Sequence, residues 1–135
     1  MFYLDTNVVI GVMNRRAPRL AARLEQEIVL GARLVLPAAV LYELRYGASK
    51  SQTPDRNHAR IDTFLDGVPE VVDFDAGDAT EAGDIRAYLE AKGAPIGPYD
   101  ILIAAQARRR GAVLVTLNRN EFERVPGLMA TDWST

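Results

Sequence analysis

The sequence predicts an α/β protein built in three layers, an α/β/α fold with helices on both faces of a central parallel sheet. Short apolar runs that fit buried strands alternate along the chain with longer stretches of helical periodicity. Parallel neighbours need a crossover connection, usually a helix, so this alternation favours a parallel sheet. The 135 residues, 48% of them hydrophobic, fit one core. Residues 1–135 are therefore expected to form a single domain.

The first elements are expected to be a strand and two helices. Residues 2–4 are a short apolar strand, and residues 6–13 follow as a short helix. Residues 18–30 form a longer helix, which Gly31 ends, because four apolar residues recur on one of its faces. These four are Leu20, Ala21, Leu24 and Ile28.

The middle of the chain is expected to continue with strand, helix, helix and strand. Residues 34–36 are a short buried strand, and Pro37 then stands where proline best starts a helix, here over residues 38–48. The elements expected after it are a helix from Thr53-Pro54 to about residue 65, a break at Gly67-Val68-Pro69 and a strand at residues 71–73.

Asp75 is expected to cap the next helix, whose apolar periodicity lasts until Gly93. Gly97-Pro98 then opens a helix over residues 99–110, which begins with a nearly all-apolar run and is expected to be buried on most sides. The remaining elements are a strand at residues 112–116, a short helix at 118–121 and an edge strand near Met129.

Composition excludes several kinds of site. No cysteine is present, which excludes disulfides, thiolate zinc sites and cysteine nucleophiles, so any metal must bind oxygen or nitrogen. The one histidine, His58, is expected on a helix surface, and it leaves little for a catalytic triad or a multi-histidine zinc site. A net charge of −2 gives no global signal for nucleic acid. With no leader-like segment and no bilayer-length apolar run, the chain is expected to be soluble, with no membrane contact, and cytoplasmic.

Acidic residues fall where the catalytic groups of open α/β sheets gather, beyond the carboxyl ends of strands. Asp5 directly follows the first strand, although it also suits a helix N-cap. Glu43 stands in an apolar stretch, so it either faces solvent or is kept inward. Asp100 opens a buried helix, where an acid also complements the helix dipole. Asn118 follows the strand at residues 112–116.

Converging carboxylates would repel one another and raise their pKa values, so their presence together makes sense if a cation neutralises them. Oxygen ligands favour Mg2+ or Mn2+. Such a site suits the hydrolysis of a phosphodiester bond. Asp5, Asp100 and Asn118 are expected to converge at this edge, and Glu43 is the further acidic candidate. Auxiliary candidates are Thr6, Asn7, Arg45, Thr116 and Glu121.

Four arginines, three in a run and one alone, are considered as candidates for RNA contacts. Arg108, Arg109 and Arg110 lie roughly 12 to 15 Å along the helix from Asp100, and we expect them to interact with the helix end and with water rather than with RNA. Arg45 is the better candidate, either for a substrate phosphate or for pairing with Glu43.

Several segments together match a known family. The chain resembles PIN-domain ribonuclease toxins of the VapC type, and the resemblance spans nearly all of it. The segments that carry it are Leu4-Asp5-Thr6-Asn7, Tyr42-Glu43 with Tyr46-Gly47-Ala48, Pro95 to Asp100 with Ile103-Ala104-Ala105, Thr116-Leu117-Asn118 with Glu121 to Val125, and the closing Gly127-Leu128 and Asp132-Trp133.

The resemblance implies a three-layer PIN fold and an Mg2+- or Mn2+-dependent endoribonuclease, the toxin of a type II toxin–antitoxin pair. It implies structured RNA such as transfer RNA as substrate, a VapB-type antitoxin whose tail covers the acidic groove, and a homodimer within a larger toxin–antitoxin assembly. Asp5 and Asp100 match the family's principal metal ligands and Glu43 its third acid. Asn118 stands where the family often has Asp, which puts a second metal in doubt, although Glu121 could supply charge.

Two alternatives come from other functional classes. A receiver-like phosphoacceptor domain also places acids at strand ends, but it would need a lysine beyond a late strand, whereas the two lysines here are Lys50 and Lys92. A non-catalytic binding module could use the acidic groove to receive an arginine-rich partner tail.

Overall fold

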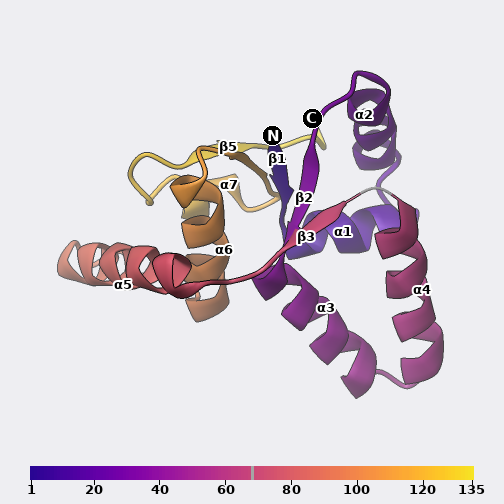
Figure 1. Cartoon of the computed structure of the whole chain (residues 1–135), viewed down its shortest axis with the longest axis horizontal. Coiled ribbons are helices and arrows are strands. Elements are labelled where there is room, and N and C mark those ends of the chain that lie inside the picture. The colour runs from indigo at the N-terminus through magenta and orange to yellow at the C-terminus, as the bar shows by residue number, and fades with distance from the viewer. Residues whose placement is uncertain (68) are drawn as a thin grey trace.

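Five parallel strands form the central sheet of the computed structural model, which describes residues 1–67 and 69–135 (Figure 1). The strand order is β3-β2-β1-β4-β5, and all four strand pairs are parallel. The predicted parallel sheet is thus confirmed. The strands are β1 (Phe2–Leu4), β2 (Leu34–Pro37), β3 (Glu70–Val72), β4 (Val113–Val115) and β5 (Met129–Thr131).

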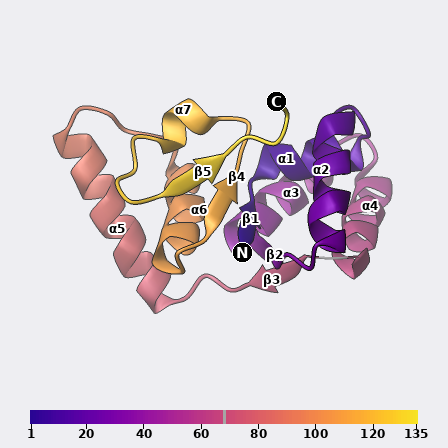
Figure 2. The same ribbon diagram turned by 90° about the horizontal axis from the view of Figure 1, so that it is seen from above.

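Helices cover both sides of this sheet, as predicted. In the described part of the chain, α1, α2 and α4 lie on one side of the strands and α5 and α6 on the other (Figures 1 and 2). Helix α3 leaves the carboxyl end of β2 and contacts both α4 and α6. The helices are α1 (Thr6–Met13), α2 (Pro18–Val29), α3 (Ala38–Lys50), α4 (Pro54–Gly67), α5 (Ala76–Ala91), α6 (Pro98–Arg109) and α7 (Arg119–Phe122).

The helix ends follow the local signals in most places. Gly31, after α2, has a φ of +80°, and Gly111, after α6, has a φ of +65°, conformations that glycine adopts without strain. Helix α3 begins at Ala38, as predicted, and Pro37 is both the last residue of β2 and the N-cap of α3. Its φ of −61° and ψ of 141° suit a strand end as well as a helix start. Of the predicted break at Gly67-Val68-Pro69, Val68 lies outside the described residues.

The core forms where β1, β2 and β4 meet α6. Leu36 of β2 and Leu114 of β4 are fully buried, as are the five consecutive residues of α6 from Ile103 to Ala107. Burial of each large aliphatic side chain contributes about 1.5–3 kcal/mol, and the alanines let the helix lie close to the strands. The prediction that α6 is buried on most sides is confirmed. Its first turn, which carries Asp100, is therefore fixed at the carboxyl edge of the sheet.

In the two described ranges, none of the helices has the length and apolar character required to cross a bilayer.

Candidate functional site

Asp5 lies at the centre of the carboxyl edge because β1 is the middle strand. The side chain is 5% exposed, and both of its carboxylate oxygens are hydrogen-bonded. The N–H of Thr6 donates to Oδ1 (2.8 Å), and Thr116 Oγ1 donates to Oδ2 (2.7 Å). Thr116 comes this close because β4 pairs with β1 in parallel register. Asp5 therefore acts as the N-cap of α1, as one reading of the sequence proposed, while its carboxylate also faces the site.

Glu43 joins this group through a hydroxyl. Thr6 Oγ1 donates to Glu43 Oε1 (2.8 Å), so Thr6 bridges Asp5 at the end of β1 and Glu43 on α3. Glu43 is partly buried, which decides between the two sequence readings in favour of an inward carboxylate. Asn7 is exposed, and within the described residues no hydrogen bond connects its side chain to these acids.

Asp100 is the acid most affected by its neighbours. Burial, followed by the negative charges of Asp5, Glu121 and Glu43, raises the pKa of Asp100 to about 7. Burial likewise raises the pKa of Asp5, against the opposing hydrogen bonds from its threonine neighbours. Asp5, Glu121 and Glu43 are thus close enough for their negative charges to disfavour the ionisation of Asp100.

Glu121 is more central than its auxiliary place in the sequence prediction. Its Oε1 accepts the N–H of Gly97, one residue before α6, and its Oε2 accepts from the amide of Asn118. A side chain at Gly97 would bring a Cβ within 3.2 Å of Asp100 Oδ2, so this glycine gives the carboxylates room. Asn118 therefore holds an acid in place.

The donor set fits a divalent cation. All the groups at the edge are oxygen ligands, and a cation among them would relieve the repulsion that raises the pKa of Asp100. Among the described residues, no three acidic or imidazole side chains are close enough to cage an ion by themselves. Mg2+ usually binds through one or two carboxylates and keeps several waters, so an open, hydrated site of this kind suits it.

Arg45 differs from one of its predicted roles. It pairs with Asp62 of α4 (2.6 Å), not with Glu43, and its guanidinium also contacts Nδ1 of His58 (3.1 Å). His58 lies on α4 as predicted, but it is partly buried because Ser49 holds its other ring nitrogen (2.9 Å). The sequence pattern could not reveal how close α4 lies to α3.

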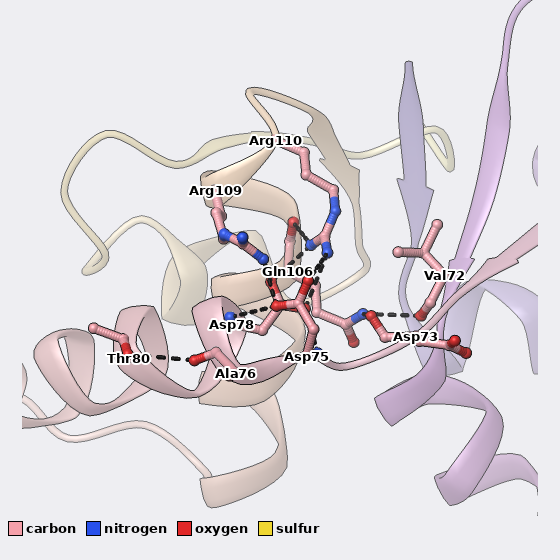
Figure 3. Close-up of polar contacts among 9 residues, drawn as sticks. All are labelled: Val72, Asp73, Asp75, Ala76, Asp78, Thr80, Gln106, Arg109 and Arg110. Carbon is pink, nitrogen blue, oxygen red and sulfur yellow. Dashed lines mark hydrogen bonds and ion pairs between the residues drawn. The ribbon is translucent and has the colours of Figure 1, made fainter.

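The arginine run at the end of α6 holds α5 and does not face water alone. Arg110 donates to both carboxylate oxygens of the buried Asp78 (2.8 and 3.0 Å), and Arg109 pairs with Asp75 (2.5 Å), as Figure 3 shows. Asp75 and Asp78 form the capping box of α5. The hydrogen bond from Arg109 lowers the pKa of Asp75 to about 2. We call these four residues the α5–α6 clasp.

Gln106 connects the same region to the sheet and to α3. Its amide donates to the carbonyls of Val72 (3.0 Å) and Asp73 (3.2 Å), as Figure 3 shows. Its Oε1 accepts the N–H of Ala39 in the first turn of α3. Gln106 is fully buried. Sequence reasoning predicted Asp75 as a helix cap, but neither the arginine pairs of the clasp nor the contacts of Gln106. The spacing of Asp75 and Asp78, three positions apart, is that of a capping box.

Comparisons with known proteins agree on one family. Residues 2–128 match the profile described as PIN domain. The chain is 43% identical to a Shigella flexneri protein called tRNA(fMet)-specific endonuclease VapC, with 98% of each chain covered. It resembles VapC in the crystal structure of DNA-bound VapBC from Salmonella typhimurium, with 42% identity, a TM-score of 0.89, and 98% and 97% of the two chains covered. It also resembles a chain of VapBC2 from Rickettsia felis bound to a promoter DNA fragment, with 36% identity, a TM-score of 0.90, and coverage of 98% and 99%.

Proposed function

Because the chain belongs to the PIN-domain family, we propose that it is an endoribonuclease dependent on Mg2+ or Mn2+, and the toxin of a type II toxin–antitoxin pair. The observation that carries this proposal is the group of four carboxylates at the carboxyl edge, where burial and then the three neighbouring charges raise the pKa of Asp100 to about 7. The three relatives reported above align over 97% or more of both chains, so nearly the whole chain takes part in the comparison.

The residues divide into ligands and supports. Asp5, Asp100 and Glu43 would hold the cation, and Glu121 adds negative charge beside them. A bound divalent cation would activate water and stabilise the charge that develops on the phosphate during hydrolysis. Thr6 and Thr116 fix the orientation of Asp5 through its two carboxylate oxygens. Asn118 holds Glu121 and stands close enough to the edge to orient water or substrate.

We propose transfer RNA as the substrate, because the Shigella flexneri relative is named for cleaving tRNA(fMet). The chain's small negative net charge gives RNA no general attraction, so affinity must come from local contacts and from the cation. Arg45 and the exposed Asn7 remain candidates for such contacts. Residues 1–135 would act as one PIN domain, in the cytoplasm where transfer RNA is found.

The partner would be a VapB-type antitoxin, since the related structures are VapBC complexes. An open cavity of about 260 Å³ beside Glu43, between α1, α3 and α4, supports this assignment. Ile10, Met13, Leu44 and Ile61 give it an apolar lining that suits a partner's side chains. A segment seated there would contact Glu43, and a homodimer of the toxin would carry two such cavities.

A receiver-like role is less well supported. Lys50 lies over the ring of Tyr46 and Lys92 over the ring of Tyr88, so both ammonium groups are near the ends of helices and not beside Asp5. A phosphoacceptor site would need one of them at the carboxyl edge.

The test is cleavage of a mixed transfer RNA pool by the purified protein with Mn2+, with chelator and with Asp100→Asn. We expect metal-dependent cuts, mapped as new ends, that disappear in the variant. Asp84→Asn is the matched control, because Asp84 is an exposed acid on α5 away from the four carboxylates. Equal cleavage by wild type and a folded Asp100→Asn would reject the assignment of Asp100 to the catalytic site. Loss of cleavage in Asp84→Asn would show that losing an acid elsewhere has the same effect, so the result for Asp100 would not be specific to the site.

A further inference from the structure

Two exposed tyrosines contact each other at the rim of the carboxylate group. Tyr42 on α3 is 51% exposed and Tyr99 on α6 is 44% exposed. Their ring centroids are 5.3 Å apart with an interplanar angle of 43°, and their hydroxyls are 3.3 Å apart. Large aromatic surface exposed to water on two helices at once is a feature that the catalytic proposal does not use.

Their position ties them to the site. Tyr42 directly precedes Glu43, and Tyr99 directly precedes Asp100, so each ring comes from the same helical turn as a carboxylate. Each ring is therefore attached one residue away from a proposed metal ligand.

The pair is preorganised for stacking. A tyrosine has only two rotatable side-chain bonds, and the contact between the two rings restrains both side chains before any ligand arrives. A planar, apolar face with polar edges matches a nucleobase, and proteins that bind single-stranded nucleic acid stack unpaired bases on such aromatic side chains. Stacking also needs no basic surface, which suits a chain with a net charge of −2.

We propose that Tyr42 and Tyr99 form a stacking platform for one unpaired nucleobase beside the scissile phosphate. This inference rests on the proposed function, and it specifies the substrate class as a single-stranded RNA segment with a base free to leave its neighbours. Because every base offers a π face, the platform itself reads little sequence. It selects loops over paired stems.

The first experiment measures binding without cleavage. Asp100→Asn protein is titrated, with Mn2+, into a uridine-rich oligoribonucleotide that carries one 2-aminopurine, whose fluorescence falls when it stacks. We expect quenching, and binding about 5- to 150-fold weaker after Tyr42→Leu with Tyr99→Leu, the change that about 1–3 kcal/mol for one stacked base corresponds to. Tyr42→Phe with Tyr99→Phe, which keeps both rings, should bind within about twofold of the parent.

The matched control is Tyr88→Leu. Tyr88 is 45% exposed on α5 and lies beneath Lys92, away from the four carboxylates, so its loss should change neither quenching nor affinity. Thermal melting of each variant checks its fold, and the single variant Tyr99→Leu replaces the double variant if the latter does not fold. In the active protein, the double leucine variant should lower kcat/KM for transfer RNA mainly through KM.

Three results would overturn the platform. Unchanged affinity and quenching in the folded leucine variants would exclude stacking, and equal losses in the phenylalanine variants would assign the effect to the hydroxyls. A change from dimer to monomer in the leucine variants, parallel to the loss of binding, would assign the tyrosines to an interface between copies of the chain. If the wild-type protein cleaves no RNA but the fluorescence is still quenched, the proposed function is rejected and the stacking platform is retained.

Discussion

Replacing Asp100 by Asn should stabilise the metal-free protein while abolishing its activity. Burial and three neighbouring carboxylates raise the pKa of Asp100 from 3.8 to about 7, and one pKa unit corresponds to 1.36 kcal/mol. The ionised carboxylate therefore costs at most about 4 kcal/mol of folding free energy. Asp100 is partly exposed, so screening by water reduces this to about 1–2 kcal/mol. Asparagine has nearly the same shape and no charge, and it removes this cost.

The sign of the pH dependence follows from the direction of the shift. Between the ordinary pKa and about 7, the folded protein keeps a proton on Asp100 that the unfolded chain has lost, so stability falls as the pH rises through this window. Urea unfolding in chelator at pH 5 and pH 8 measures the effect. We expect Asp100→Asn to exceed wild type by about 1–2 kcal/mol at pH 8 and by much less at pH 5.

Mn2+ should reverse the order of stability of wild type and Asp100→Asn. At a concentration of 100 times its Kd, a ligand that binds only the native state adds about 2.7 kcal/mol. Wild type should gain this stability and Asp100→Asn should gain little. An Asp100→Asn protein that is less stable than wild type at pH 8 in chelator would refute the reasoning, because the crowded carboxylates would then impose no cost. Asp84→Asn, tested in parallel, should show no pH-dependent difference.

Two further predictions concern the clasp and the fourth site position. Asp78→Asn should lower stability by about 2–3 kcal/mol at pH 7, because the partly buried Arg110 loses its closer charge partner and keeps Asp75 at 3.8 Å. Burial opposes the ionisation of Asp78, but the hydrogen bonds from the arginines hold its pKa below the ordinary value, so in urea titrations the difference from wild type should shrink as the pH falls below about 4. Asn118→Asp should lower the melting temperature in chelator and strengthen Mn2+ binding in calorimetry, because it places another carboxylate against Glu121; weaker Mn2+ binding would show that Asn118 serves only to hold that acid.

The sequence predicted the sheet and the convergence of acids for one physical reason. Parallel strands bring their carboxyl ends to a single edge, so Asp5 after β1 and Asn118 after β4 had to be neighbours once the two strands paired. The buried run after Asp100 likewise fixed the direction of α6 against the sheet. These inferences need only the strand and helix periods.

Contacts between helices were beyond such reasoning. The partner of Arg45 depends on how closely α4 packs against α3, and the partners of Arg109 and Arg110 depend on where α5 begins relative to the end of α6. Periodicity gives the face that a helix buries, but not the angle at which two helices cross. Glu121 was underestimated for a similar reason, since its hydrogen bond to Gly97 joins α7 to the start of α6, between residues that are 24 positions apart.

The α5–α6 clasp and Gln106 have a consequence at the other end of α6. They connect the last turns of the helix to α5, to the end of β3 and the residue after it, and to the start of α3. Asp100, in the first turn of the same helix, therefore cannot retreat from the other carboxylates when it ionises. The repulsion among the carboxylates therefore persists at the edge of the sheet until a cation or a proton neutralises part of their charge.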